Sequence, residues 1–547
     1  MMFLCPAAAL AQTTSEPGHI DERFRPQPEK PTVGAPIDIP ATPRTTAPKG
    51  SEGVHFKLKS VEFTGNSVLS DSVLQQMASS YVGREVTLAE VYALADSVTA
   101  EYRSRGYILV RAIPPAQRIT DGHLKIRVIE GFIANVKIQG DAGGARPYLE
   151  AYGRRIQKIA PLTADVLERE LLLASDLTGL RLRSVLTPSS VTGGADLTFV
   201  VDPKPVDAYL YFDNRGSKYL GPYELMAGIF ANDAFGTGGR LGLNAVMTPN
   251  AGPELGYGAI SYDQPLGENG LKLFSSFSVT RTRPGSVLKL LGTKGRALNW
   301  DGTLSYPITR SRDLNIIVSG GFAYKDVRSS NIAANPLFSD HVRSLNAALF
   351  INTLDNWGGY STASATITKG LGIFGATRSS SPNKSRFFAD GSYWRGNIEL
   401  THEQPIGNQV SLFLAAAGQT SFGGSLLASE QFSLGGTGYD RGFDPSEVTG
   451  DSALAGRAEL RWTAVAEAGL ISNVQLYGFY EGGKVWQDRV LPGSLKSESL
   501  FSAGAGVRFQ LADNFHANVE WAKPLNRDVA AKGNRDSRVF FSVGVNL

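Results

Sequence analysis

Few residues of this sequence are spaced as a catalytic or metal site requires. A Gly-Asp-Ser-Ala-Leu block at 450–454 is similar to the nucleophile block of some hydrolases, but it stands before a predicted strand, which favours a polar turn. The Gly-x-Gly-x-x-Gly pattern at 370–375 is followed by a polar loop and not by the helix that a dinucleotide site needs. The histidines lack the short spacings of metal ligands and are scattered over the chain: His19, His55, His123, His341, His402 and His516. The sequence therefore predicts no enzyme activity, no metal and no cofactor.

An arginine and a later glutamate could instead form a pair that holds one segment against another. The planar guanidinium of Arg441 presents a fork of donors that binds a carboxylate through two parallel hydrogen bonds, and Glu481 could supply that carboxylate. Gly442 would allow a tight turn beside the arginine, and Phe443 could pack on a neighbouring wall. The alternative for so short a run is an ordinary surface turn.

The composition excludes several classes of protein. Of the 547 residues 42% are hydrophobic and 19% charged, so the chain is not disordered by composition. No stretch approaches the roughly 18 to 20 consecutive apolar residues of a transmembrane helix. A formal net charge of only +3 gives a nucleic-acid partner no electrostatic support. Abundant glycine and aromatic residues in short apolar alternations favour many strands and turns.

The first residues are typical of a secretory signal followed by a linker. Residues 1–11 are mostly apolar and end in Ala-Leu-Ala, which predicts cleavage before Gln12, although the usual basic residues in front are missing. A buried N-terminal strand is the alternative. Cys5, the only cysteine, lies in this segment, so the mature chain needs no disulfide. Residues 12–54 are rich in proline and predict an extended, mobile linker.

Two tandem β-α-α-β-β units follow, over residues 55–131 and 132–205. In the first unit Thr87 and Glu90 form a capping box at the start of the second helix. Strands are predicted at 56–64, 107–113, 123–129, 133–139, 180–187 and 195–201, and helices at 70–77, 87–105, 147–156 and 163–175. Two copies of one unit in succession are an internal repeat.

Residues 206–547 lose the helical periodicity and alternate as strands. In the last strand one face carries Val539, Phe541, Val543, Val545 and Leu547. Another strand alternates Ala458, Leu460 and Trp462 with Arg457, Glu459 and Arg461. This is the pattern of a transmembrane barrel, with an apolar lipid face and a charged lumen face. A soluble sandwich also alternates, but it does not usually place three charges in a row on an inner face. The alternation around Glu481 directs that residue inward as well.

Several motifs resemble those of one superfamily of outer-membrane barrels. The tandem units resemble POTRA domains, the periplasmic modules of polypeptide transporters. The run at 435–443 ends in Asp-Arg-Gly-Phe and resembles the Val-Arg-Gly-Tyr/Phe motif of the sixth barrel loop, with Asp440 in place of valine. The run at 479–483 resembles the Phe-x-Asp-x-Gly strand motif, with Glu481 in place of aspartate. Two such units, a proline-rich lead and a barrel of this length most resemble the TpsB transporters of two-partner secretion.

This resemblance implies an α+β POTRA pair in the periplasm, followed by an all-β barrel in the bacterial outer membrane. Sixteen antiparallel strands are implied, although the length alone also allows 14 or 18. The implied function is the secretion, and possibly the activation, of one large unfolded exoprotein of the hemolysin or adhesin class, without a nucleotide. The motifs imply that Arg441, Gly442, Phe443 and Glu481 anchor the long loop inside the barrel.

The sequence leaves two alternative functions. An insertase of the same superfamily usually carries three or more POTRA units, and an outer-membrane enzyme or passive porin would leave both units unexplained. Family members often thread an N-terminal helix through the barrel. Here the proline-free stretch 18–25 is only eight residues long, which argues against such a plug.

Overall fold

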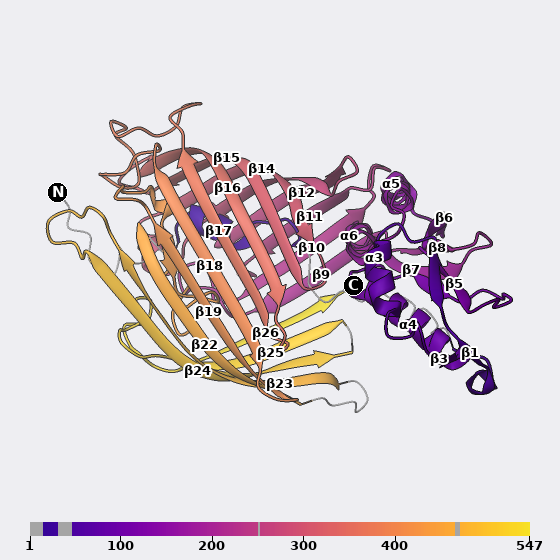
Figure 1. Ribbon diagram of the computed structural model, residues 1–547. Coiled ribbons are helices and arrows are strands. Elements are labelled where there is room, and N and C mark those ends of the chain that lie inside the picture. The colour runs from indigo at the N-terminus through magenta and orange to yellow at the C-terminus, as the bar shows by residue number, and fades with distance from the viewer. Residues whose placement is uncertain (1–14, 31–45, 250–251, 465–470, 513) are drawn as a thin grey trace. The chain divides into compact units, whose positions relative to one another are not determined.

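The computed structural model describes residues 15–30, 46–249, 252–464, 471–512 and 514–547 (Figure 1). The predicted signal segment 1–11 lies outside these residues. The chain forms two compact units, one of residues 35–204 with 310–312 and the other of the remaining residues. No helix among the described residues has the length and apolar character needed to cross a membrane.

The first half of the smaller unit is a β-α-α-β-β fold. Its elements are η1 (Ser51–Gly53), β1 (His55–Lys57), β2 (Ser60–Thr64), α3 (Asp71–Ala78), β3 (Glu85–Thr87), α4 (Leu88–Ser104), β4 (Arg111–Ile113) and β5 (His123–Ile129). The main sheet has the order β2-β5-β4, while β1 pairs with β3. The predicted strand 56–64 is broken because Leu58 donates to Arg84 and Lys59 donates to Gly122, so the chain changes partner there. The predicted capping box of α4 is present, with Thr87 Oγ1 3.1 Å from the Glu90 nitrogen.

The second half of this unit repeats the fold with its own core. Its elements are β6 (Phe132–Gln139), η2 (Gly143–Ala145), α5 (Arg146–Gln157), α6 (Ala164–Ser175), β7 (Leu180–Pro188) and β8 (Gly194–Pro203). The sheet has the order β6-β8-β7, with β6 parallel and β7 antiparallel to β8. Leu167, Leu171 and Phe199 lie in its apolar core. The predicted internal repeat is therefore present in the structure.

The larger unit is a closed barrel of sixteen antiparallel strands, in which β26 pairs with β9. The strands are β9 (Val206–Asp213), β10 (Glu224–Asn232), β11 (Arg240–Met247), β12 (Leu255–Leu266), β13 (Leu271–Thr282), β14 (Lys294–Arg310), β15 (Leu314–Ser330), β16 (Phe338–Leu354), β17 (Tyr360–Gly370), β18 (Trp394–Pro405), β19 (Val410–Thr420), β22 (Ser452–Ala464), β23 (Ile471–Trp486), β24 (Ser497–Leu511), β25 (Phe515–Pro524) and β26 (Arg538–Asn546). The predicted fold class and strand number are confirmed.

The strands alternate between a lipid face and a lumen face, as the sequence predicts. On β22 the side chain of Leu460 is 56% exposed, whereas its neighbour Glu459 is 1% exposed and points inward. On β26 Val539 is exposed outward and Phe540 is buried inside. The outward side chains are mostly apolar, which suits contact with hydrocarbon.

The two ends of the barrel differ in the length of their connections. At the end where β9 begins, the turns are short, for example 311–313 and 406–409. At the other end the connections include 371–393 and 421–451. The second of these, called the lumen loop below, contains η3 (Ala428–Glu430), β20 (Phe432–Leu434) and β21 (Val448–Gly450). A shorter one carries α7 (Ser286–Leu290).

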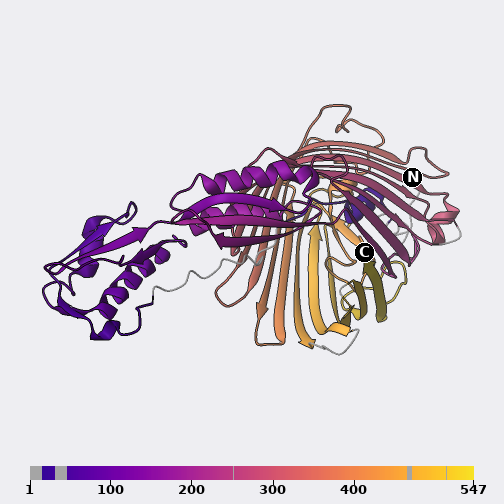
Figure 2. The same cartoon turned by 90° about the vertical axis from the view of Figure 1, so that its right-hand side faces the viewer.

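The N-terminal segment forms a helix, α2 (Pro17–Phe24), inside the ring of strands (Figures 1 and 2). The Glu16 side chain accepts a 2.8 Å hydrogen bond from the His19 nitrogen, and Pro17 occupies the first turn. The prediction of an extended linker is therefore wrong for these residues. The argument against a plug from its length is also wrong, because the wall stabilises a helix too short to be stable alone.

Candidate functional site: the barrel lumen

Arg441 lies buried in the lumen among three carboxylates from three strands. Its Nε is 3.2 Å from Glu481 Oε2 on β23, one terminal nitrogen is 2.8 Å from Glu520 on β25, and the other is 3.0 Å from Glu459 on β22. The Arg441 backbone nitrogen also donates to Glu481. The structure thus brings Arg441 and Glu481 together. The two-bond pairing with one carboxylate does not occur, because the fork divides its donors among three acceptors.

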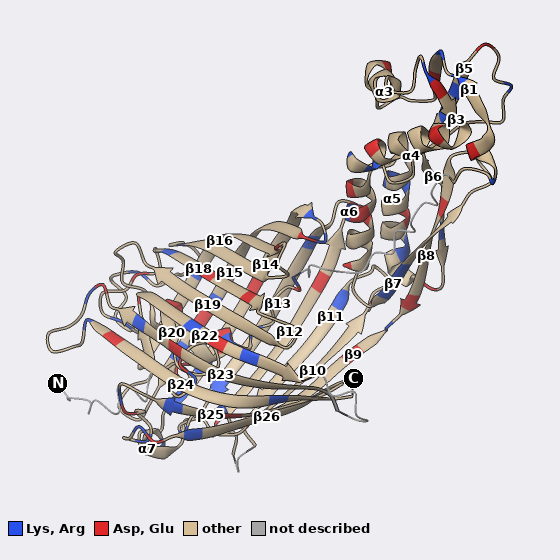
Figure 3. Cartoon of the chain, turned by 60° about the horizontal axis from the view of Figure 1, so that its bottom comes forward, with Lys and Arg blue, Asp and Glu red and all other residues tan. Residues whose placement is uncertain are grey.

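Further arginines neutralise the same carboxylates. Glu459 also contacts Arg461 at 2.8 Å and Arg508 at 2.9 Å, and Glu520 contacts Arg215 at 2.8 Å. Buried charges are tolerated when they are paired in this way. Basic and acidic residues gather on these strands (Figure 3).

Sequence reasoning missed two of the three carboxylates that bind Arg441. The alternation places Glu459 on the lumen face but gives it no partner. Glu520 stands between Val519 and Trp521, which are both exposed on the outside, so the same alternation could have placed it inward. What alternation cannot supply is the height of each residue in the barrel, which depends on strand register.

Gly442 and Phe443 complete the contact of the lumen loop with the wall. A Cβ added to Gly442 would lie 3.0 Å from the Pro524 nitrogen and from Ser502 Cβ, so the glycine permits close approach to the wall. The predicted role of Gly442 in the turn belongs instead to Asp440, which has a φ of 64°. Phe443 is buried with Leu434 and other apolar residues against the inner wall.

Asp440 is an unusual residue for so buried a position. It is fully buried, and neither carboxyl oxygen has a hydrogen-bond partner among the described residues. Burial, together with the nearby negative charge of Glu481, raises the pKa of Asp440 to about 8. Aspartate adopts the left-handed backbone more readily than the β-branched valine of the family motif.

A second ionic contact holds the lumen loop to other strands. Glu430 of η3 is 2.8 Å from the Lys325 amine on β15 and 2.9 Å from the Arg395 guanidinium on β18. Tyr393 donates a 2.6 Å hydrogen bond to the same carboxylate. Burial alone would raise the pKa of Glu430, but the two cations lower it to about 2. The lumen loop thus contacts two separate parts of the wall.

The Gly-Asp-Ser block at 450–454 is a structural junction. Asp451 is fully buried and pairs with Arg386 of the 371–393 connection. It also accepts hydrogen bonds from the Leu426 nitrogen at 3.0 Å and from the Gln431 amide at 3.2 Å. The predicted polar turn is a bend at Asp451 between β21 and β22. Residues 370–375 form no helix, as expected.

Helix α2 contacts both the wall and the lumen loop. Arg23 binds Glu224 of β10 through two hydrogen bonds of 2.8 and 2.6 Å. Asp21 is buried and accepts a 2.5 Å hydrogen bond from Ser278 of β13. A Cβ built on Gly18 would lie only 2.5 Å from Ser429 Cβ of η3. The helix and the lumen loop therefore meet directly inside the barrel.

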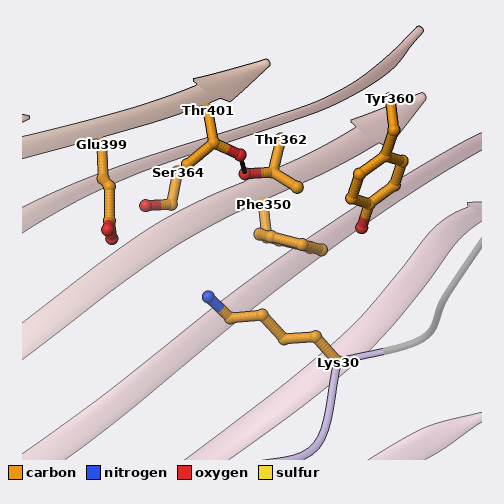
Figure 4. A pocket seen from close by; sticks show the side chains of 7 residues that line it. All are labelled: Lys30, Phe350, Tyr360, Thr362, Ser364, Glu399 and Thr401. Atoms are coloured by element: carbon orange, nitrogen blue, oxygen red, sulfur yellow. Dashed lines mark hydrogen bonds between the residues drawn. The ribbon is translucent and has the colours of Figure 1, made fainter. Parts of the chain in front are cut away.

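The wall beyond α2 is polar and recessed (Figure 4). A recess of about 270 Å³ lies where the Lys30 amine sits 4.5 Å from the ring centre of Phe350. Thr362 and Thr401 share a 2.6 Å hydrogen bond on its floor. The other lining residues are Tyr360, Ser364 and Glu399. Such a surface favours water or a passing peptide backbone over a buried apolar ligand.

Comparison with known families decides the identity of this barrel. Residues 194–509 match the haemolysin secretion/activation protein family ShlB/FhaC/HecB, and residues 56–131 match the ShlB-type POTRA domain. The chain belongs to the ShlB/FhaC/HecB family. It is an outer-membrane transporter of two-partner secretion, with POTRA domains in the periplasm, and the long connections at the other end of its barrel face outward.

Two transporters from other bacteria align with most of this chain. It is 25% identical to the heme/hemopexin transporter protein HuxB of Haemophilus influenzae strain 86-028NP, over 95% of this chain and 92% of HuxB. It is 24% identical to the outer membrane transporter CdiB of Escherichia coli, over 86% of this chain and 79% of CdiB.

Solved structures show the same fold. CdiB from Escherichia coli aligns over all of both chains with a TM-score of 0.72 and 20% identity. BamA from Haemophilus ducreyi lacking POTRA domains 1–3 aligns less well, with a TM-score of 0.53 and 16% identity over 90% of this chain and 99% of BamA. The insertase alternative thus corresponds only to a more distant relative.

Proposed function

We propose that this transporter exports one large unfolded exoprotein of the hemolysin or adhesin class through the lumen that α2 occupies at rest. The observation that carries the proposal is the polar character of the contacts around α2. Arg23 and Asp21 bind wall residues through hydrogen bonds that water or a peptide backbone can replace. Ile20 and Phe24 are the apolar contacts that a client chain must also replace, against Leu220, Leu255 and Tyr257.

The two three-stranded sheets of the periplasmic unit differ in how their edges are covered. Helix side chains cover three edges: Gln75 donates to Val61 of β2, Thr99 accepts from Ala112 of β4, and Gln157 donates to Ala134 of β6. Among the described residues, no such side-chain hydrogen bond covers the outer edge of β7. An extended client segment can add to this edge through backbone hydrogen bonds, with little demand on sequence.

The exposed face of β7 favours a particular client chemistry. Arg181 and Arg183 are exposed, and Val185 follows them on the same face. A client segment with acidic side chains at alternate positions would place them opposite the two arginines. Acidic, extended segments of the exoprotein are therefore the expected ligands of β7.

Secretion of a coexpressed exoprotein tests this function. The partner is the large secreted protein that we expect a neighbouring reading frame to encode. Proline is placed in turn at each position from 182 to 186. Where the N–H points away from β8, proline removes a donor that an added client strand would use and leaves the pairing of β7 with β8 intact. Those variants should secrete less, while Val191→Pro in the following turn serves as the control. Unchanged secretion at every position would exclude strand addition at β7. A partner that stays in the periplasm with the unaltered transporter would contradict the function itself.

A further inference from the structure

Two arginines face each other on the lipid side of the barrel. The register of β13 and β14 places Arg281 directly opposite Arg296. Both are exposed, and they share the outer face with Phe277 and Trp300, which are 39% and 41% exposed. Each arginine stands four residues beyond its aromatic neighbour, toward the end that carries the long connections. The pair therefore lies just outside the apolar band, at the outer boundary of the membrane.

More positive charge lies around this pair. Lys294 is exposed two positions before Arg296 on the same face of β14. Arg328 is exposed near the end of the neighbouring strand β15, where it donates to the neutral amide oxygen of Asn335 at 3.0 Å. On the other side, Gly256 of β12 pairs with Arg281, and a Cβ built there would meet nothing within 4 Å. Arg281 thus borders open space on the β12 side.

The charges of this patch have no acidic partner among the described residues, as the ion pairs of the structure show. Other basic residues at this end of the barrel have a partner within the protein. Arg343 forms an ion pair with Asp326, and the Lys369 amine lies 4.9 Å from the ring centre of Trp394. Like charges directly opposite one another destabilise a pair of strands. An external anion placed between Arg281 and Arg296 would remove this repulsion.

We propose that Arg281, Lys294, Arg296 and Arg328 form a site for the phosphate-bearing headgroup of an anionic glycolipid in the outer leaflet. The position at the edge of the apolar band lets the acyl chains lie against Phe277 and Trp300 while the phosphate meets the cations. Arginine suits this ligand because its fork binds phosphate oxygens through two bonds. The site is independent of the client and of the proposed function.

Binding of lipid A to the purified full-length transporter in detergent tests the proposal. Diphosphoryl lipid A should bind more tightly than monophosphoryl lipid A, and inorganic phosphate should not compete at equal concentration. Arg281→Gln with Arg296→Gln should weaken binding roughly 30-fold, since each basic residue near a charged lipid surface contributes about 1 kcal/mol. Arg281→Lys with Arg296→Lys should retain most of the affinity.

Controls separate a local site from a general charge effect. Arg118→Gln with Arg127→Gln removes two exposed arginines from the periplasmic unit and should leave lipid binding unchanged. Heat-modifiable mobility checks that each barrel is folded. If the 281/296 variant fails to fold, Lys294→Gln with Arg328→Gln should show a similar loss. Undiminished binding in a folded variant would overturn the proposal, and full competition by inorganic phosphate would show a free-anion site and overturn the lipid assignment.

Discussion

The lumen loop and helix α2 both fill the barrel, but they are held in different ways. Arg441 of the loop is 5% exposed, and its three carboxylate partners are almost fully buried. The Arg23 side chain of α2 is 23% exposed and binds one carboxylate, that of Glu224, which is 2% exposed. Breaking a buried ion pair costs about 3 to 5 kcal/mol, whereas an exposed pair contributes about 0 to 1 kcal/mol. Arg441 with three buried partners is therefore harder to release than Arg23 with one, which is why we propose that the loop stays in place while the helix leaves.

The largest effect is expected from the loss of Arg441. Arg441→Ala leaves Glu459, Glu481 and Glu520 without their shared cation, at a cost of about 3 to 5 kcal/mol. The barrel should still insert, because the remaining arginines and the strand ladder are intact, but secretion should fall at least about tenfold. Partner secretion and heat-modifiable mobility measure the two effects. Normal secretion by a folded Arg441→Ala barrel would show that the ion pairs of the lumen loop are not needed for secretion.

A smaller effect is expected from Glu481→Ala, which removes one of the three carboxylates that bind Arg441. Arg441 keeps Glu459 and Glu520 in this variant, so secretion should fall less than in Arg441→Ala. The double variant should be little worse than Arg441→Ala alone, because residues in one network are not additive. Glu399→Ala, which removes a lumen carboxylate that makes no ion pair with Arg441, is the matched control. Additive losses in the double variant would mean that the two residues act separately.

Arg23→Ala should loosen the helix by about 1 to 3 kcal/mol, between the values for an exposed and a buried pair, because Arg23 is 23% exposed but Glu224 only 2%. The expected result is a higher frequency of open-channel events in planar bilayers and entry of large antibiotics into cells, with secretion retained. Glu22→Ala removes an exposed charge of α2 and should have less effect. A pore that stays as closed as the unaltered one would show that Arg23 does not hold the helix.

A pH dependence is expected from Asp440. Its pKa of about 8 in the folded protein lies above the ordinary 3.8, so the folded state binds the proton more tightly than the unfolded chain. Stability therefore falls as pH rises from about 4 to about 8. Asp440→Asn should flatten this slope and leave the lumen loop more resistant to trypsin at pH 8.5 than the unaltered loop. Equal slopes in the two proteins would show that the carboxyl is hydrated.

The sequence predicts the strands of the barrel wall better than the lumen loop and helix α2 inside it. Two-residue alternation is a local property, so it places Leu460 outside and Glu459 inside correctly. The arrangement around Arg441 depends on register between distant strands, which no local pattern contains. Helix α2 was missed for a related reason: its stability comes from Ser278, Glu224 and the lumen loop and not from its own length.

Two engineered disulfides test most directly whether the helix leaves and the loop stays. Gly18→Cys with Ser429→Cys ties α2 to the lumen loop, and Gly450→Cys with Val485→Cys ties the lumen loop to β23. Cβ atoms built at these positions lie 2.5 and 2.6 Å apart, so a small shift reaches the roughly 3.8 Å of a disulfide. When oxidised, the first tether should block secretion until a reductant is added, and the second should leave secretion intact. Secretion through the fully oxidised first tether would show that α2 need not leave, and a block by the second tether would show that the lumen loop must move.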